Sequence, residues 1–434
     1  MIRKYGYTIL LSITGIFIVV IFLFSKKPKQ SIPSFKERKG SVALAGEWLN
    51  TKQAIEGLLK DIELNPENYK AKLNLSQAYI QEARVTGDHA YYDAAALELL
   101  DDVVKNEPKN FDALCCKATV LLSQHHFAEA LLVAQNALVI NNQSAFIYGI
   151  MCDAYVELGK YKEAVKVTDK MISIRPDIRS YSRISYLREI HGDYKGSIEI
   201  AKLAVAAGYP GLEQSVWARI ILGNLYKNIG QLDSAEYQYK YALVERPDYA
   251  FAIAGLASIA KAKGNYKEAI AGYEKAKAMI IEYSFDDELT DLYKLNNEPQ
   301  KAINSALDVV EQLSPISNVD ENEKGHGHYA DRELAYAYLK VPNLDSALNH
   351  AIIEYNRRPE NIDVCETIAW VYYKLKNYTE ANKMINKAMA TNSQNPLLLY
   401  RAGLIKTKVG EVAVGGELIK KALATNPYLK NVEL

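Results

Sequence analysis

Residues 145–178 read AFIYGIMCDAYVELGKYKEAVKVTDKMISIRPDI, and this stretch decides the fold of the chain. Two apolar helical patterns flank Leu158-Gly159-Lys160-Tyr161, where a glycine suits a helix end and an apolar residue follows it. Pro176 stops the second helix, because proline cannot continue one. Cys152 and Ala164 are small enough to let the two helices approach closely. The stretch therefore predicts one helix–turn–helix unit.

The same unit recurs along most of the chain, mostly at spacings of 33 or 34 residues. A small residue opens the second helix of each unit, and another small residue stands twelve positions earlier in the first helix of nine units, while Ser76 takes this place in the first unit. The second-helix column is Ala96, Ala130, Ala164, Ser197, Ala235, Ala269, Ala302, Ala347, Ala381 and Gly415. Because a single helix pair cannot bury its apolar face alone, the units are expected to stack into a continuous array.

These landmarks resemble the tetratricopeptide repeat over residues 69–428, most clearly in 145–178 and 216–249. The resemblance implies an all-α fold, a right-handed α-solenoid of about ten helix pairs, whose first helices line a concave surface that binds protein or peptide partners. The consensus tryptophan of the first helix is absent, and Lys376 and Pro342 replace the turn glycine in two units. Those units are expected to be less regular.

The spacing also predicts a domain organisation. Two longer gaps place a small excursion around Tyr209-Pro210-Gly211 and a larger polar one at ISNVDENEKGHG, and the first unit carries an eight-residue insertion. The expected parts are a transmembrane segment at 1–25, a basic spacer at 26–40, a capping half repeat at 41–68, seven repeats at 69–315, a loop insertion at 316–327, three repeats at 328–429 and a tail at 430–434.

The N-terminal segment is uncharged from Tyr5 to Ser25 and has lysine or arginine on both sides. At about 1.5 Å per helical residue it reaches across the roughly 30 Å hydrocarbon core of a bilayer. An uncleaved single-pass anchor is favoured over a cleaved signal peptide, because lysines follow the apolar run and Ala43-Leu44-Ala45 comes late. The basic residues on the two sides of the segment are nearly equal in number, so they do not settle its orientation. The basic stretch that leads the apolar run favours placing the repeat array on the extracytoplasmic, periplasmic side.

The bulk composition argues against several function classes. Lys+Arg and Asp+Glu both number 52, so no overall field attracts nucleic acid, and none is expected as a partner. No phosphate-binding glycine loop, Gly-x-Ser-x-Gly elbow or HExxH motif is present, so we expect neither an enzyme nor a cofactor. The alternatives are an enzyme's regulatory subunit, or self-association at the C-terminal edge, where no solvating helix follows the last proline.

The resemblance also places candidate residues on the concave groove. Its lining positions in the middle units are Arg179, Tyr186, Trp217, Asn224, Lys227, Phe251, Ser258 and Lys261. Aromatic rings, amides and cations in this mixture could hold an extended peptide by stacking, hydrogen bonding and carboxylate pairing. The alternative is that Trp217 and Phe251 only fill gaps between units.

A second candidate is a basic ladder of lysines near the ends of successive first helices. It comprises Lys227, Lys261, Lys294, Lys340, Lys374 and Lys408. Stacked one per unit, these lysines would attract an acidic peptide. The alternative is that each only complements its helix dipole, which favours a terminal cation by about 0.3–1 kcal/mol.

The histidines give only a weak indication of a metal site. His326-Gly327-His328, with Asp331 and Glu333, offers metal ligands, but on a loop and without further partners. His125-His126 falls in a turn between helices, where we expect exposed and inert side chains. We therefore expect no metal centre.

Overall fold

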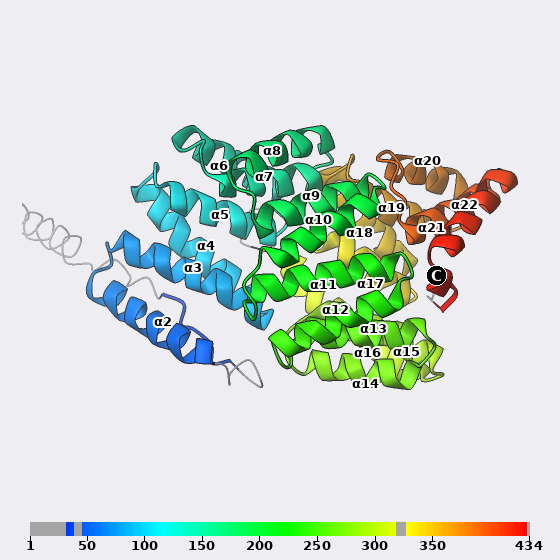
Figure 1. The fold of residues 1–434 in the computed structure, drawn as a ribbon, viewed down its shortest axis with the longest axis horizontal. Helices are drawn as coiled ribbons and strands as arrows, with labels where there is room; N and C mark the ends of the chain where they lie inside the picture. Colours follow the sequence, from blue (N-terminus) through cyan, green and yellow to red (C-terminus); the bar gives the residue numbers. More distant parts are fainter. Residues whose placement is uncertain (1–31, 39–45, 318–326, 432–434) are drawn as a thin grey trace, which may run out of the picture. The chain divides into compact units, whose positions relative to one another are not determined.

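The computed structural model describes residues 32–38, 46–317 and 327–431, and within them it contains twenty-one α-helices, one short 3-10 helix and no strand. The chain from Glu37 onward forms one compact unit. One helix, α2 (Gly46–Leu64), precedes ten helix pairs, which follow one another along the chain in Figure 1. The predicted all-helical solenoid is confirmed for the described residues.

The ten pairs have the following bounds: α3 (Tyr69–Thr86) with α4 (His89–Asn106), α5 (Phe111–Ser123) with α6 (Phe127–Ile140), α7 (Ala145–Glu157) with α8 (Tyr161–Ile174), α9 (Ile178–Ile190) with α10 (Tyr194–Ala206), α11 (Glu213–Asn228) with α12 (Leu232–Glu245), α13 (Ala250–Ala262) with α14 (Tyr266–Lys277), α15 (Tyr283–Leu295) with α16 (Pro299–Ser317), α17 (Asp331–Lys340) with α18 (Leu344–Arg357), α19 (Ile362–Lys374) with α20 (Tyr378–Ala388), and α21 (Pro396–Lys408) with α22 (Val412–Thr425). The 3-10 helix η2 (Pro427–Asn431) follows the last pair.

Turns between paired helices depend on a residue with positive φ. Gly159 has a φ of 72°, where glycine escapes the clash of a Cβ with the backbone. Lys376 adopts a φ of 62° at the equivalent position, so the loss of glycine there does not change the turn. The Pro342 turn differs, because Val341 caps α17 in an extended conformation.

The predicted small-residue columns form the contacts within and between pairs. Ala130, Ala164 and Ala235 are fully buried. A Cβ added to Gly223 or to Gly255 would fall within 2.7 Å of the Tyr239 ring, which packs against both glycines. The small side chains are therefore required by the closeness of the helices.

The irregular spacings appear as changes in helix length and linker length. The insertion in the first unit lengthens both of its helices, since α3 and α4 have 18 residues each. The Tyr209–Gly211 excursion lies in the linker between α10 and α11. The larger excursion begins inside α16, which continues to Ser317, and residues 318–326 lie outside the described part of the chain.

The predicted membrane segment, residues 5–25, also lies outside the described residues. Among the helices that are described, none combines the length and the apolar character needed to cross a bilayer.

Contacts between residues about 200 positions apart do not follow from the sequence pattern. The Tyr161 hydroxyl accepts from the Ile362 amide at 2.8 Å, and Asn426 Nδ2 donates to the Lys227 and Asn228 carbonyls at 3.2 and 3.1 Å. Six units of about 34 residues account for this separation. Successive turns of the solenoid therefore touch, and we call these bonds the inter-turn contacts.

The inter-turn contacts follow a rule. The turn between the two helices of pairs 1, 2, 3 and 4 contacts the linker that precedes pairs 7, 8, 9 and 10, respectively. The turn of pair 5 contacts the segment that follows pair 10. The five meetings are Thr86-Gly87 with Ile281, His125-His126 with Gly327–Tyr329, Gly159-Tyr161 with Glu360–Ile362, Gly192 with Asn392–Gln394, and Asn228–Gly230 with Asn426-Pro427.

Candidate partner-binding surface

Three of the predicted groove residues line one pocket. Lys227, Ser258 and Lys261 surround a volume of about 230 Å³ together with Glu288 of α15. The opposite wall comes from the end of the array and comprises Asn395, Pro396, Leu397, Asn426, Tyr428 and Leu429. We call this volume the lysine pocket. Its two walls meet because of the inter-turn contact at Asn426.

The charges of the lysine pocket are unevenly compensated. Lys261 Nζ lies 2.7 Å from Glu288 and 3.7 Å from Asp291. Although burial opposes it, this pairing raises the pKa of Lys261 and lowers that of Glu288 to about 2. Lys227 has no carboxylate within 4.0 Å among the described residues; burial lowers its pKa, the attraction of Glu288 partly opposes this, and repulsion from Lys261 adds to the lowering. The lysine pocket therefore holds two lysines and one glutamate, and the glutamate is paired with Lys261.

The aromatic groove candidates mainly contact each other. The rings of Trp217 and Phe251 meet edge to face with centroids 5.0 Å apart, and Phe251 meets Phe285 of the next unit at 5.8 Å. Asn224 accepts a hydrogen bond from the Tyr239 hydroxyl at 2.7 Å. This arrangement corresponds to the alternative in which these side chains fill gaps between units.

The remaining two groove candidates lie apart from the lysine pocket. Arg179 is exposed, with its guanidinium 5.2 Å from the centre of the Phe146 ring. Tyr186 borders a second pocket, of about 190 Å³, with Glu189, Asp363 and Glu366. Burial raises the pKa of Glu189 to about 6. This second pocket is acidic where the first is basic.

The lysine ladder is not uniform. Lys340 lies 2.8 Å from Asp287 and 3.0 Å from Asp291, so it is engaged like Lys261. Lys374 lies over the Trp370 ring, and the exposed Lys408 lies 5.8 Å from the centre of the Tyr378 ring. Lys294 is half-buried near the end of α15. Of the six positions, Lys227 combines a place inside a pocket with the absence of a nearby carboxylate among the described residues.

The expectation that His125 and His126 are exposed is wrong. His126 is 7% exposed and its ring stacks on Tyr329 with centroids 4.0 Å apart. His125 is half-buried, and the centroid of its ring is 4.1 Å from that of His328. The reason is the inter-turn contact, which lays the segment before α17 over this turn. Burial lowers the pKa of His125 to about 4 and, together with the neighbouring His125, that of His328 to about 3.

Several residues of these sites cannot be recognised from the sequence. Asn395 caps α21 and Asn426 ends α22, and both resemble ordinary helix-boundary residues. The one signal is the sequence separation of Asn426, which lies about six units after Lys227, whose carbonyl it binds.

One helix pair of this array matches a known repeat family. Residues 362–395, which are α19, α20 and the following linker, match the family model of the tetratricopeptide repeat. The unit at residues 362–395 is therefore a tetratricopeptide repeat (TPR). The same helix pair recurs at the same spacing on both sides of the matched unit.

The chain is also similar to individual TPR and other proteins. It is 29% identical over 146 residues to cellulose synthase 1 operon protein C of Komagataeibacter xylinus, covering 31% of this chain and 11% of that relative's length. Among solved structures it resembles a thermophilic TPR protein of Thermus thermophilus, with 22% identity, 44% of this chain and 98% of that one covered, and a TM-score of 0.39. It also resembles PilW, a type IV pilus biogenesis factor, with 17% identity, coverages of 48% and 95%, and a TM-score of 0.39.

Proposed function

We propose that this TPR array is a non-catalytic scaffold that binds a protein partner by accepting an acidic side chain or a terminal carboxylate in the lysine pocket. The observation that carries the proposal is Lys227, a half-buried cation in the pocket with no carboxylate within 4.0 Å among the described residues. A charge taken partly out of water without a partner is costly, and an incoming carboxylate offsets that cost by forming a charge-assisted hydrogen bond.

The size of the pocket supports a small anchoring group. A volume of about 230 Å³ holds one or two side chains and is below the range of pockets that enclose a drug-sized ligand. Asn395 and Asn426 add side-chain amides to its far wall. The rest of a bound peptide would lie outside the pocket.

Substitution of Lys227 by methionine is expected to weaken binding of acidic peptides at least tenfold, because it removes the unpaired charge and keeps most of the apolar stem. The measurement is fluorescence anisotropy with labelled peptides that carry a free or an amidated C-terminus. If the unaltered protein binds the amidated peptide more weakly than the free one, the pocket accepts a terminal carboxylate. The exposed Lys408 provides the matched control, Lys408→Met, which should bind as the unaltered protein does. Equal affinity of the two variants would contradict the proposal.

We further propose that residues 5–25 anchor the array to a membrane, with the array on the extracytoplasmic side, where it takes part in assembling an envelope complex. The support is the uncharged run between basic flanks. The full chain is expected to stay with membranes during alkaline extraction, and a chain beginning at residue 32 should be released. Release of both would contradict the anchor.

Regulation of an enzyme remains the second candidate function. Co-purification of an active enzyme after crosslinking in the native membrane would favour it.

A further inference from the structure

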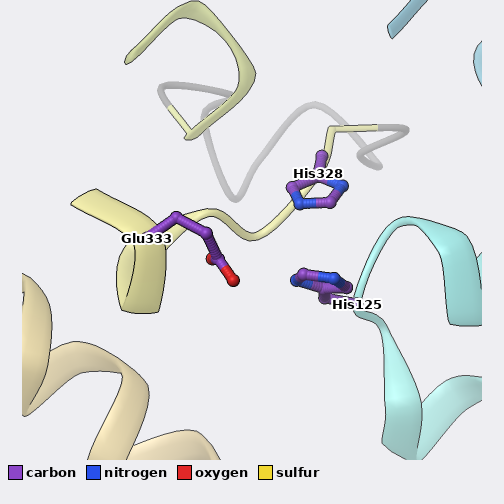
Figure 2. A group of neighbouring side chains, drawn as sticks. All are labelled: His125, His328 and Glu333. Carbon is purple, nitrogen blue, oxygen red and sulfur yellow. The ribbon is translucent and has the colours of Figure 1, made fainter. Parts of the chain in front are cut away.

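Three side chains from two distant parts of the sequence converge at one inter-turn contact. His125 lies in the turn between α5 and α6, His328 lies in the segment before α17, and Glu333 lies in the first turn of α17. One ligand atom from each lies within 4.8 Å of the other two. Figure 2 shows the two imidazole rings facing each other, with the Glu333 carboxylate pointing toward the space beside them.

The His125 ring is held in place by a hydrogen bond across the inter-turn contact. Its Nδ1 lies 2.9 Å from the Tyr329 carbonyl oxygen and donates to it, and the Tyr329 amide donates to the Gln124 carbonyl at 3.0 Å. With the Nδ1 proton used in this bond, Nε2 carries the free lone pair. Metal-binding histidines commonly use such a bond from the second ring nitrogen to a carbonyl to fix the tautomer.

Glu333 contributes a second, independent observation, a buried carboxylate oxygen without a hydrogen-bond partner among the described residues. Its side chain is 10% exposed, and Oε2 is buried without any hydrogen-bond partner among the described residues. The other oxygen, Oε1, lies 3.8 Å from Arg332, too far for a hydrogen bond. Buried carboxylate oxygens are ordinarily paired, because leaving one unsatisfied is costly.

The surrounding charges are compatible with a cation. The adjoining cleft, of about 340 Å³, is lined by Asp153, Glu157 and Glu333 and by two arginines, Arg332 and Arg358. Arg358 is already engaged by Glu354 and Glu157. Asp153 is likewise engaged by Arg183, so most of the charged groups at the cleft already have a partner.

We propose that His125, His328 and Glu333 bind one divalent transition-metal ion of the zinc class, and that the ion fastens two successive turns of the TPR array together. Two imidazoles and one carboxylate form a ligand set that zinc, cobalt and nickel accept, whereas calcium and magnesium prefer oxygen ligands alone. Water or a partner's side chain completes the coordination. This site is separate from the lysine pocket and does not depend on it.

The first test is isothermal titration of the chelator-treated full chain with zinc chloride. We expect one equivalent bound with micromolar or tighter affinity. His328→Ala and Glu333→Gln should each weaken binding at least tenfold. The matched control is His191→Ala, since His191 is an exposed histidine in the turn of another pair. Absence of stoichiometric binding, or equal binding by the ligand variants and the control, overturns the proposal.

The second test separates loss of a ligand from loss of the fold. His125 has a φ of 62°, and asparagine tolerates that conformation, so His125→Asn preserves the turn better than alanine does. This variant should keep the circular dichroism spectrum of the unaltered chain and lose zinc affinity. Zinc should also slow hydrogen exchange of the Tyr329 amide in the unaltered chain, because the ion spans the contact that this amide makes. Zinc bound without that protection would overturn the fastening role.

Discussion

Replacing Gly159 by alanine is expected to lower the free energy of unfolding by about 2 kcal/mol or more, from the left-handed backbone penalty and from overpacking. Gly159 has a φ of 72°, and a Cβ placed on it would overlap the backbone carbonyl and the side chain of Glu360. Glu360 belongs to the linker on the next turn of the solenoid. Because the overlap involves backbone, the linker has to move as a whole.

Gly264→Ala is the matched control for this prediction. Gly264 has a φ of 82° at the same position of its turn, but no atom lies within 4 Å of an added Cβ. Gly264→Ala should therefore lower the free energy of unfolding only through the left-handed backbone penalty, by about 1–2 kcal/mol. The measurement is urea unfolding of both variants followed by circular dichroism. Equal losses would show that the inter-turn contact at Gly159 contributes nothing to stability.

Arg358→Ala is expected to cost about 3 kcal/mol or more, because it breaks a buried ion-pair network from one side. Arg358 is 5% exposed, pairs with Glu354 of α18 and with Glu157 of the preceding turn, and lies 4.7 Å from the centre of the Phe127 ring. Without it, the carboxylate of Glu354, whose side chain is 3% exposed, keeps only its bond to Arg357. Thermal unfolding and urea unfolding should both report the loss.

An exposed ion pair provides the comparison. Lys383 and Glu380 lie 3.7 Å apart with largely solvated side chains, so Lys383→Ala should change stability by no more than about 0.5 kcal/mol. Arg358→Met would retain packing on Phe127 and separate the contribution of the charge. If Arg358→Ala costs no more than Lys383→Ala, the network does not hold the turns together.

The repeat can be predicted from the sequence because its causes are local. The small residue at Ala164 and the proline at Pro176 act within one unit, and the period repeats them. Even the replacement of glycine by Lys376 leaves the turn unchanged. The prediction for the Lys261 position is less complete, because its partner Glu288 lies on the next first helix, outside the unit that the pattern describes.

The inter-turn contacts cannot be predicted in the same way. Whether Gly159 meets Glu360 depends on the small rotation between neighbouring units, added over six units, and no single residue encodes it. For that reason the sequence predicts an exposed turn at His125, although the segment before α17 covers it. The sequence does not predict the whole lysine pocket for the same reason, because about half of the residues that line it come from the end of the array.

These contacts also have a consequence for biosynthesis. A solenoid held only by neighbouring units can complete each unit as it leaves the ribosome. Here the Glu157 side chain gains its partner Arg358 only after a further 201 residues have been synthesised. At translation rates of roughly 5–20 residues per second, that wait lasts about 10–40 s. During that interval the turns between the helices of the first five pairs lack the segments that cover them in the complete chain.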